Sequence, residues 1–437
     1  MSETTGVLLK RGGAGEVNIV MPKKVSYIID TLYEKGYEAF AVGGCIRDSL
    51  LGKVPKDWDI TTNALPLEIK DIFPRTIDTG IEHGTVTVMI DKEGFEVTTY
   101  RIDGEYEDAR HPKSVEFTSN LKLDLMRRDF TINAMAYNDV AGLVDEFDGE
   151  MDLQKGIIRC VGDALTRFDE DALRILRAIR FSARFGFDIH EDTIAAIKAK
   201  SPLLTKISAE RIKAELDKTL LSNHPKQLIL AAENGVFDNI LCRIGNILKG
   251  ANNVKIIERI ERLHRIASRD GFDEKQILAM CWTSLIYDYS ANEAKEHYKE
   301  LKSDNYLLRL STALISNKEK ALNPVDYDIR KLASEVGADI MPCLLAIREC
   351  MAEDDFALEV VRDCSKIYRE EVEKNHCMHL SEMAVTGKEL IAAGIKPGKH
   401  MGDLLLYLLE NVLLNPLDNN KEHLINIALE YEKKNVH

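Results

Sequence analysis

The sequence predicts an α/β head followed by an all-α remainder, and three observations lead to this fold class. Strand-like alternation and glycine-marked turns are concentrated between residues 21 and 155. Helical periodicity then continues to residue 437 with few strand signals. A chain of 437 residues is also too long for one hydrophobic core. We therefore expect a mixed sheet in the first part and helix packed on helix in the rest.

Apolar spacing and glycines define the expected elements of the head. Residues 25–32 have helical spacing and end near Gly36, and residues 39–42 form a short apolar strand that stops at Gly43 and Gly44. A helix over 45–51 ends at Gly52. A hairpin turn is expected at residues 91–94. The remaining strand-like segments are 57–61, 85–90, 95–101 and 143–147.

Strand signals fade after about residue 155. Three segments have helical periodicity there, namely 163–185, 192–200 and 208–221. Ser208 is a good N-cap for the last of them. Amphipathic helices with short polar breaks continue to the end of the sequence, so we expect a long helical body behind the head.

Composition restricts the classes of function. The eight cysteines are scattered without a CxxC pair, so neither a zinc site nor a redox motif is expected. We expect reduced, mostly buried thiols in a cytosolic protein. The sequence begins without a secretory pattern and contains no run of about 20 apolar residues, so no membrane partner is expected. The net charge of −14 is a weak argument against a polyanionic partner, because binding depends on where basic groups cluster.

The first informative run spans residues 41–52 (AVGGCIRDSLLG), where a strand leads into paired glycines and then a helix. Because Gly43 and Gly44 lack a Cβ, backbone amides there can approach a phosphate closely. The helix start adds amides and a favourable dipole. Arg47 follows within the first turns, where its guanidinium could reach a triphosphate. Taken alone, the run indicates only an ordinary strand–turn–helix.

The second run is Asp57-Trp58-Asp59-Ile60. Alternate side chains of a strand share a face, so Asp57 and Asp59 are expected to point together while Trp58 and Ile60 face the core. Two carboxylates so close repel each other unless a cation lies between them. Mg²⁺ prefers oxygen ligands of this kind and also takes substrate phosphates. Asp57 and Asp59 are therefore the predicted metal ligands, and a polar edge strand is the alternative.

A third carboxylate is worth seeking, because two-metal phosphoryl transfer commonly uses one. Glu96 is the candidate, since it opens a strand on which Glu96, Thr98 and Tyr100 share one face. It could position or deprotonate an attacking hydroxyl. A glutamate at the rim of the site is an equally good interpretation.

Taken together, these runs resemble the bacterial-type (class II) tRNA nucleotidyltransferases, which are CCA-adding enzymes, and their relatives the bacterial poly(A) polymerases. The further matching runs are 127–136 (RRDFTINAMA), 170–174 (EDALR) and 177–181 (RAIRF). The resemblance implies a polymerase-β-like head and Mg²⁺-dependent nucleotidyl transfer, with tRNA, CTP and ATP as partners. It also implies an N-terminal extension (1–20), a catalytic head (21–155), a nucleotide-selecting and RNA-binding neck (156–225), a helical body (226–350) and a tRNA-binding tail (351–437).

The resemblance assigns roles to several single residues. Arg128 is expected to contact the triphosphate or ribose of a nucleotide. Asp129 and Asn133 are expected to fix the turn and the helix start that follow. Arg177 and Arg180 would extend the phosphate contacts.

An acid next to an arginine offers a way to choose C and A without a template. On a helix over 163–185, Glu170 and Arg174, Arg177, Arg180 and Arg184 fall on one side and Asp171 lies at its border. Cytosine and adenine both present an exocyclic amine beside a ring-nitrogen acceptor, which a carboxylate and an arginine can read. Guanine and uracil present the reverse order. Asp171 and Arg174 are therefore the predicted protein template, and a solvated helix face with salt bridges is the alternative.

Several functions remain possible within and beyond this resemblance. The polar stretch 103–114 resembles the loop that such enzymes are thought to need for switching from C to A addition, and relatives that stop at CC are shortened there. Its presence favours CCA addition or A addition alone. The bacterial poly(A) polymerases share the head. One unrelated alternative is a catalytically silent RNA-binding scaffold, which the intact Asp57/Asp59 pair disfavours. Another is a DxD glycosyltransferase, which does not predict the helix with Asp171 and Arg174.

Overall fold

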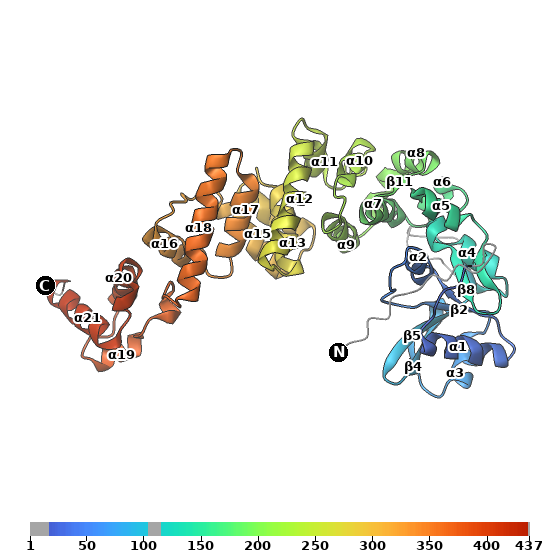
Figure 1. Cartoon of the computed structure of the whole chain (residues 1–437), viewed down its shortest axis with the longest axis horizontal. Helices are drawn as coiled ribbons and strands as arrows, with labels where there is room; N and C mark the ends of the chain where they lie inside the picture. Colours follow the sequence, from blue (N-terminus) through green and yellow to red (C-terminus); the bar gives the residue numbers. More distant parts are fainter. Residues whose placement is uncertain (1–16, 104–114, 436–437) are drawn as a thin grey trace. The chain divides into compact units, whose positions relative to one another are not determined.

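The structure is a computed structural model that describes residues 17–103 and 115–435. The chain forms two compact units, Met1–Val254 and Lys255–His437, which are coloured along the sequence in Figure 1. Most of the predicted extension 1–20 and nearly all of the predicted loop 103–114 lie outside the described residues. The predicted boundaries at residues 155, 225 and 350 stay predictions. No helix in the described ranges is both long and apolar enough to cross a membrane.

A seven-stranded mixed sheet forms the centre of the first unit, with the strand order β3-β4-β5-β2-β1-β8-β9. β2 and β5 are parallel, and the other neighbours are antiparallel. The strands are β1 (Ala39–Val42), β2 (Ile60–Thr62), β3 (Thr76–Gly80), β4 (Thr85–Ile90), β5 (Glu93–Thr99), β8 (Met135–Asn138) and β9 (Gly142–Asp145). The helices α1 (Lys23–Glu34), α2 (Gly44–Leu50), α3 (Pro66–Ile72), α4 (Leu121–Met126) and α5 (Gly149–Lys155) accompany them. This is the predicted α/β head.

The turn between β4 and β5 is shorter than predicted. Asp91 and Lys92 alone form it, with φ of 49° and 71°, and Ile90 already pairs with Glu93. Positive φ at both central residues matches the right-handed twist of the flanking strands. The predicted hairpin is thus confirmed, but Glu93 and Gly94 belong to β5, so the expected turn over 91–94 was two residues too long.

The predicted strand over 57–61 also needs correction. Only Ile60–Thr62 forms β2, so Asp57 and Asp59 lie in the segment that leads into the strand. The expected alternation nevertheless holds, because Trp58 and Ile60 are buried and both aspartates are exposed. A backbone bond from Val42 N–H to the Asp59 carbonyl (2.9 Å) fixes this segment beside β1.

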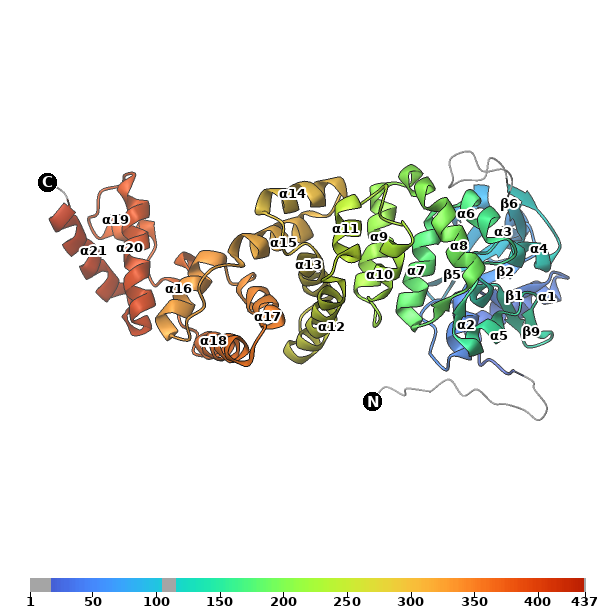
Figure 2. The ribbon, with the colours of Figure 1, turned by 90° about the horizontal axis from the view of Figure 1, so that it is seen from above.

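Behind the sheet, the first unit ends in helices that carry the predicted arginine face. They are α6 (Ala164–Glu170), α7 (Leu173–Phe185), α8 (Glu191–Lys200), α9 (Ala209–Leu220), α10 (Gln227–Glu233) and α11 (Cys242–Lys249). α7 packs against α9 and α10, as Figure 2 shows. A small parallel pair, β10 (Ile157–Ile158) and β11 (Asp188–Ile189), joins the start of this region to the end of α7.

The predicted single helix over 163–185 was wrong, because the chain breaks at Asp171. This residue has extended backbone angles (φ −141°, ψ 102°), and α7 starts two residues later. Its Oδ1 accepts a hydrogen bond from the Leu173 backbone N–H at 3.0 Å. An aspartate side chain that bonds to nearby backbone amides competes with helix continuation. The break separates Glu170, at the end of α6, from the arginines of α7.

The second unit is helical throughout the part that the structure describes. Its helices are α12 (Asn253–Asp270), α13 (Glu274–Leu285), α14 (Ala291–Glu300), α15 (Asn305–Asn317), α16 (Asp326–Val336), α17 (Met341–Met351), α18 (Asp355–Glu373), α19 (Gly387–Ala392), α20 (His400–Leu414) and α21 (Lys421–Asn435). Capping boxes begin α13 and α14, at Asp273 and Ser290. A separate apolar cluster within this unit joins α19, α20 and α21. The α/β head and helical remainder are thus confirmed.

Candidate active site

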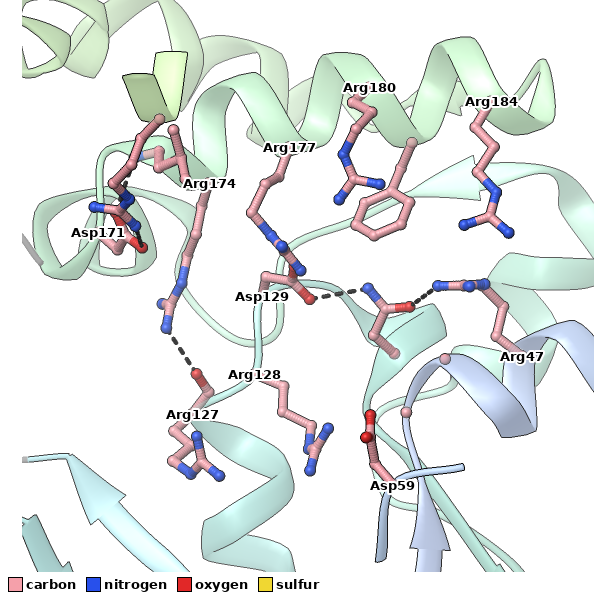
Figure 3. Close-up of a pocket in the computed structure, with 16 residues that line it drawn as sticks. Arg47, Asp59, Arg127, Arg128, Asp129, Asp171, Arg174, Arg177, Arg180 and Arg184 are labelled. Atoms are coloured by element: carbon pink, nitrogen blue, oxygen red, sulfur yellow. Dashed lines mark hydrogen bonds and ion pairs between the residues drawn. The ribbon is translucent and has the colours of Figure 1, made fainter. Parts of the chain in front are cut away.

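One cavity of about 450 Å³ in the first unit gathers most of the predicted site residues. Figure 3 shows Arg174, Arg177, Arg180 and Arg184 projecting from the same side of α7 toward Asp59 and the segment around Asp129. The lining residues come from α2, the approach to β2, the segment 127–133, α7 and α9. They are Gly43, Gly44, Arg47, Asp59, Arg127, Arg128, Asp129, Asn133, Asp171, Leu173, Arg174, Arg177, Arg180, Phe181, Arg184 and Arg211.

Glycine is required at the floor of this cavity. Gly43 has φ of 80°, and a Cβ there would lie 2.9 Å from Nη1 of Arg128. Its N–H donates to the Met135 carbonyl at 3.0 Å, which fixes the turn against β8. The absence of a side chain thus lets Arg128 lie directly over the turn before α2.

Arg47 lines the cavity but is held more firmly than a surface phosphate ligand. Its side chain is buried, and Nη1 donates to Oδ1 of Asn133 at 2.5 Å. Nε donates to Asp48 at 2.8 Å. The guanidinium also stacks over the rings of Phe181 (5.3 Å) and Phe185 (4.9 Å). Burial lowers the pKa of Arg47 from its ordinary value, and the nearby Asp48 opposes that effect.

Asp129 is the centre of the polar network. Its Oδ2 accepts from Arg177 at 2.6 Å, and its Oδ1 accepts from Asn133 Nδ2 (3.0 Å) and from the Phe130 N–H (2.8 Å). Burial alone would raise the pKa of Asp129, but Arg177 and the Asn133 bond outweigh it and lower the pKa to about 2. Because Asn133 in turn holds Arg47, one chain of contacts joins α7 to α2. The bonds of Asp129 to Phe130 and Asn133 span the start of the short 3₁₀ helix Thr131–Asn133, and the roles predicted for Asp129 and Asn133 stay predictions.

The structure brings one of the two predicted metal ligands to the cavity. Asp59 lines it, whereas Asp57 does not, and both residues are exposed. Enough protein surrounds the Asp59 carboxylate that desolvation raises its pKa; Arg128 opposes this effect and the charge of Asp57 adds to it. Among the described residues, no three His, Cys, Asp or Glu side chains gather in a group that could hold a metal.

Glu96 is not brought to the cavity. It is an exposed residue of β5 opposite Thr87 and is absent from the cavity lining. Glu96 and Thr98 share a face of β5 as predicted, but Tyr100 lies beyond the end of the strand and is buried. That face does not carry the Glu96 carboxylate into the site.

Asp171 and Arg174, the two residues predicted to read the base, are not paired with each other but with other residues. Asp171 Oδ2 pairs with Arg211 of α9 at 3.0 Å. Arg174 pairs with Glu170 at 2.6 Å and also donates to the Arg127 carbonyl at 2.9 Å. Asp171, Arg174 and Arg211 all line the same end of the cavity, so the acid and the arginines do meet there.

The remaining arginines of α7 are each matched by an acid. Arg177 pairs with Asp129, and Arg180 pairs with buried Glu215 of α9. Arg184, about half exposed, lies 3.3 Å from Asp48. Asp129 raises the pKa of Arg177, whereas burial lowers that of Arg180. The helix therefore presents a row of positioned guanidinium groups to the cavity.

Sequence reasoning missed four residues that build this site. Asp124 on α4 is fully buried and pairs with Arg127 (2.8 Å) and Arg128 (3.4 Å), which orients both arginines. Arg211, Arg127 and Phe181 line the cavity. The one sequence signal for Arg211 is its place on the predicted helix 208–221, and only packing of that helix on α7 could have connected it with Asp171.

Comparisons with known proteins match this architecture along almost the whole chain. The family model of the Poly A polymerase head domain matches residues 39–159, the "Probable RNA and SrmB- binding site of polymerase A" matches 186–244, and tRNA nucleotidyltransferase domain 2 matches 275–428. The CCA-adding enzyme of Pediococcus pentosaceus is 35% identical over 410 residues, which cover 93% of this chain and 97% of that protein. The corresponding protein of Enterococcus faecalis is 36% identical, with 94% and 97% covered. The chain belongs to the CCA-adding enzyme family.

A solved structure supports the same assignment. The CCA-adding enzyme of Bacillus stearothermophilus, in complex with CTP, is 29% identical to this chain, with a TM-score of 0.79 and with 95% of this chain and 99% of that one covered. The predicted resemblance is thereby confirmed. In this CCA-adding enzyme family member, α7 lies between the matched segments 39–159 and 186–244. Because the cavity is lined by residues of α7, of the head segment 39–159 and of α9, it is built from both matched segments and from the helix between them.

Proposed function

We propose that this protein adds C, C and A to the 3′ end of tRNA, using CTP and ATP and releasing pyrophosphate without a nucleic-acid template. The curated relatives that carry the name CCA-adding enzyme match it over nearly their full length, and the similar solved structure contains CTP. The observation that carries the proposal is that one cavity holds Asp59 together with an acid and arginines able to read a base.

Base choice in this proposal belongs to Asp171, Arg174 and Arg211. Asp171 already accepts from Leu173 and Arg211. An ionised carboxylate has about four lone-pair sites, so it can still accept from the exocyclic amine of cytosine or adenine. Arg174 supplies donors for the neighbouring ring nitrogen. Uracil and guanine would place a carbonyl against Asp171 and an N–H against the arginine, which costs on the order of 1–3 kcal/mol for each mismatched pair.

The guanidinium groups farther along α7 are placed for the phosphates. Arg177 and Arg180 line the cavity between the base-reading end and Arg184, and Arg47 faces them from α2. Each is held by an acid, an amide or an aromatic ring, so little side-chain entropy is lost when a triphosphate binds. We assign these four arginines and Arg128 to triphosphate binding, with Gly43 and Gly44 allowing close approach of the backbone.

Mg²⁺ is the proposed cofactor, and Asp57 and Asp59 are the residues that would hold it. Both are exposed and Asp59 lines the cavity; desolvation raises the pKa of Asp59, and the like charge of Asp57 adds to that rise, which a cation would offset. Two carboxylates leave coordination positions for water and substrate phosphates, as Mg²⁺ prefers. When bound, the ion would supply Lewis-acid stabilisation of charge on the phosphoryl oxygens. We further propose a cytoplasmic location, since all eight cysteines are free thiols.

Feeding the protein tRNAs that end one, two or three nucleotides short, with each nucleotide in turn, tests the proposal. We expect C, C and then A to be added and growth to stop there. A product that gains A only on tRNA ending in CC would indicate an A-adding enzyme. A long A tail would indicate a poly(A) polymerase. Either product, or none, would contradict CCA addition.

Asp57→Asn and Asp59→Asn test the metal assignment. We expect kcat to fall at least about 100-fold in each, because Lewis-acid stabilisation is worth several kcal/mol, while the Kd for tRNA changes less than about two-fold. Asp30→Asn is the matched control, since Asp30 is an exposed acid of α1 in the same unit. Full activity of both site variants in Mg²⁺ would remove Asp57 and Asp59 from the reaction.

A further inference from the structure

A second, smaller cavity adjoins the proposed nucleotide pocket at the far end of α7. Its volume is about 260 Å³, and it is lined by Arg180, Arg184, Lys218, Leu221, Ser222 and Asn223. Arg180 and Arg184 also line the larger cavity. The two spaces therefore share a wall of two arginines, and the smaller one leads away from the base-reading end.

Acids balance two of the three cations that line this groove, and the third is Lys218. Glu215 pairs with Arg180, and Asp48 lies 3.3 Å from Arg184. Lys218 is exposed and makes no ion pair with any residue that the structure describes. The neighbouring acid of α9, Asp217, pairs with Lys213 instead. Exposed Asn223 adds an amide at the rim. A small groove with an unpaired lysine beside two arginines attracts a compact anion.

The order of groups along α7 places this groove on the leaving-group side. Asp171 and Arg174 lie at the N-terminal end of the helix, and Arg180 and Arg184 lie one to two turns beyond Arg177, as Figure 3 shows. A nucleotide whose base is held at the first end would direct its outer phosphates toward the second. The groove begins where those phosphates would lie.

We propose that the Arg184–Lys218 groove is a pyrophosphate site that receives the leaving group after each addition. This inference rests on the proposed nucleotidyl transfer. In that reaction the 3′ hydroxyl oxygen forms a bond to the α-phosphorus, and the bond from that phosphorus to the bridging oxygen of the β-phosphate breaks. Pyrophosphate departs with the electron pair, and the hydroxyl proton passes to water. Removal of the product along Arg180 and Arg184 clears the pocket for the next nucleotide.

Pyrophosphate fits this groove better than an RNA backbone does. The groove is small and shares two lining arginines with the nucleotide pocket. An RNA strand needs a basic track that extends over several nucleotides. RNA phosphates share the same chemistry, so the experiment separates the two sources.

Lys218→Glu and Asn223→Asp each place a negative charge in the groove, and Lys198→Glu is the matched control because Lys198 is an exposed lysine of α8 outside both cavities. We measure inhibition of CMP addition by inorganic pyrophosphate, the KM for pyrophosphate in the reverse reaction, and binding of pyrophosphate to the full chain by calorimetry. Both groove variants should raise the Ki, KM and Kd for pyrophosphate by roughly three- to ten-fold. These changes should exceed any change in the KM for CTP, and Lys198→Glu should leave them near the wild-type values.

The outcomes distinguish this proposal from the function on which it rests. If the wild-type protein adds no nucleotide and releases no pyrophosphate, the proposed function itself fails. If it does so and both groove variants match Lys198→Glu, only the pyrophosphate site is overturned. A raised KM for tRNA with unchanged pyrophosphate constants would assign the groove to RNA phosphates and would also overturn it.

Discussion

Asp129 offers the sharpest quantitative test of how the site is held together. The change Asp129→Asn keeps the shape of the side chain and removes its charge. It weakens the 2.6 Å contact with Arg177 and leaves that guanidinium without its acid, whereas the bond from Asn133 has a possible replacement acceptor in the new amide. Because Asp129 is only 7% exposed, solvent screens little of this loss.

The pKa of Asp129 gives the magnitude. It lies at about 2 in the folded protein, against an ordinary value of 3.8. At about 1.4 kcal/mol per pKa unit, the ionised form contributes on the order of 2 kcal/mol to the stability of the folded unit. A depressed carboxyl pKa stabilises above the unfolded value, so the contribution is complete above about pH 4.5. It is lost as the pH falls from there toward 2.

Tryptophan fluorescence can follow this unit alone. The chain has two tryptophans, Trp58 beside the site and Trp282 on α13 in the second unit. In a Trp282→Phe background, Trp58 reports unfolding of the first unit by denaturant. This separation matters, because a single two-state fit is not valid for a chain of two units. We expect Asp129→Asn to lose about 2 kcal/mol at pH 7 and progressively less below pH 4.

Asp30→Asn in the same background is the control, and it should change stability by less than about 0.5 kcal/mol. Two results would refute the reasoning. One is equal stability of Asp129→Asn and the control at pH 7. The other is a stability difference that stays constant down to pH 2.5, since a charge-dependent contribution must shrink there.

Two further changes test the reader and the third carboxylate. Arg211→Gln removes the ion-pair partner of Asp171. We expect the ratio of kcat/KM for CTP to that for UTP to fall about ten-fold or more, because a hydrogen bond to a charged group is worth about 1.5–3 kcal/mol. An unchanged ratio would contradict a role for Arg211 in base choice. Glu96→Gln should lower kcat by less than about two-fold, since an exposed residue outside the cavity has little effect. A loss near 100-fold would instead indicate that Glu96 reaches the attacking hydroxyl.

Local patterns in the sequence were sufficient for much of the head. The apolar run 39–42 is β1 with its predicted limits, and the alternation around Trp58 correctly separated exposed acids from buried neighbours. These features depend on residues adjacent in the chain. β3 was missed because a local pattern is absent there: burial along Thr76–Gly80 does not alternate from residue to residue.

Pairings between distant segments could not be predicted in this way. Asp171 and Arg211 are 40 positions apart, and nothing in either local pattern links them. The break at Asp171 was equally hidden, because the arginine spacing continues at helical intervals across it and only the bond to Leu173 shows why the helix stops. Glu96 shows the converse error, since a correctly predicted strand face does not specify which cavity it borders.

The contacts of α7 couple the position of the proposed base-reading residues to the position of the proposed phosphate-binding residues. The helix is tied to the segment 127–133 at two points, through Arg174 to the Arg127 carbonyl and through Arg177 to Asp129. That same segment reaches the floor of the site, because Arg128 lies over Gly43. A shift of α7 would therefore move the base reader and strain the phosphate-binding floor together. The proposed template-free selection depends on this coupling, because a base read at Asp171 is useful only if the α-phosphate of that nucleotide then lies beside Asp59.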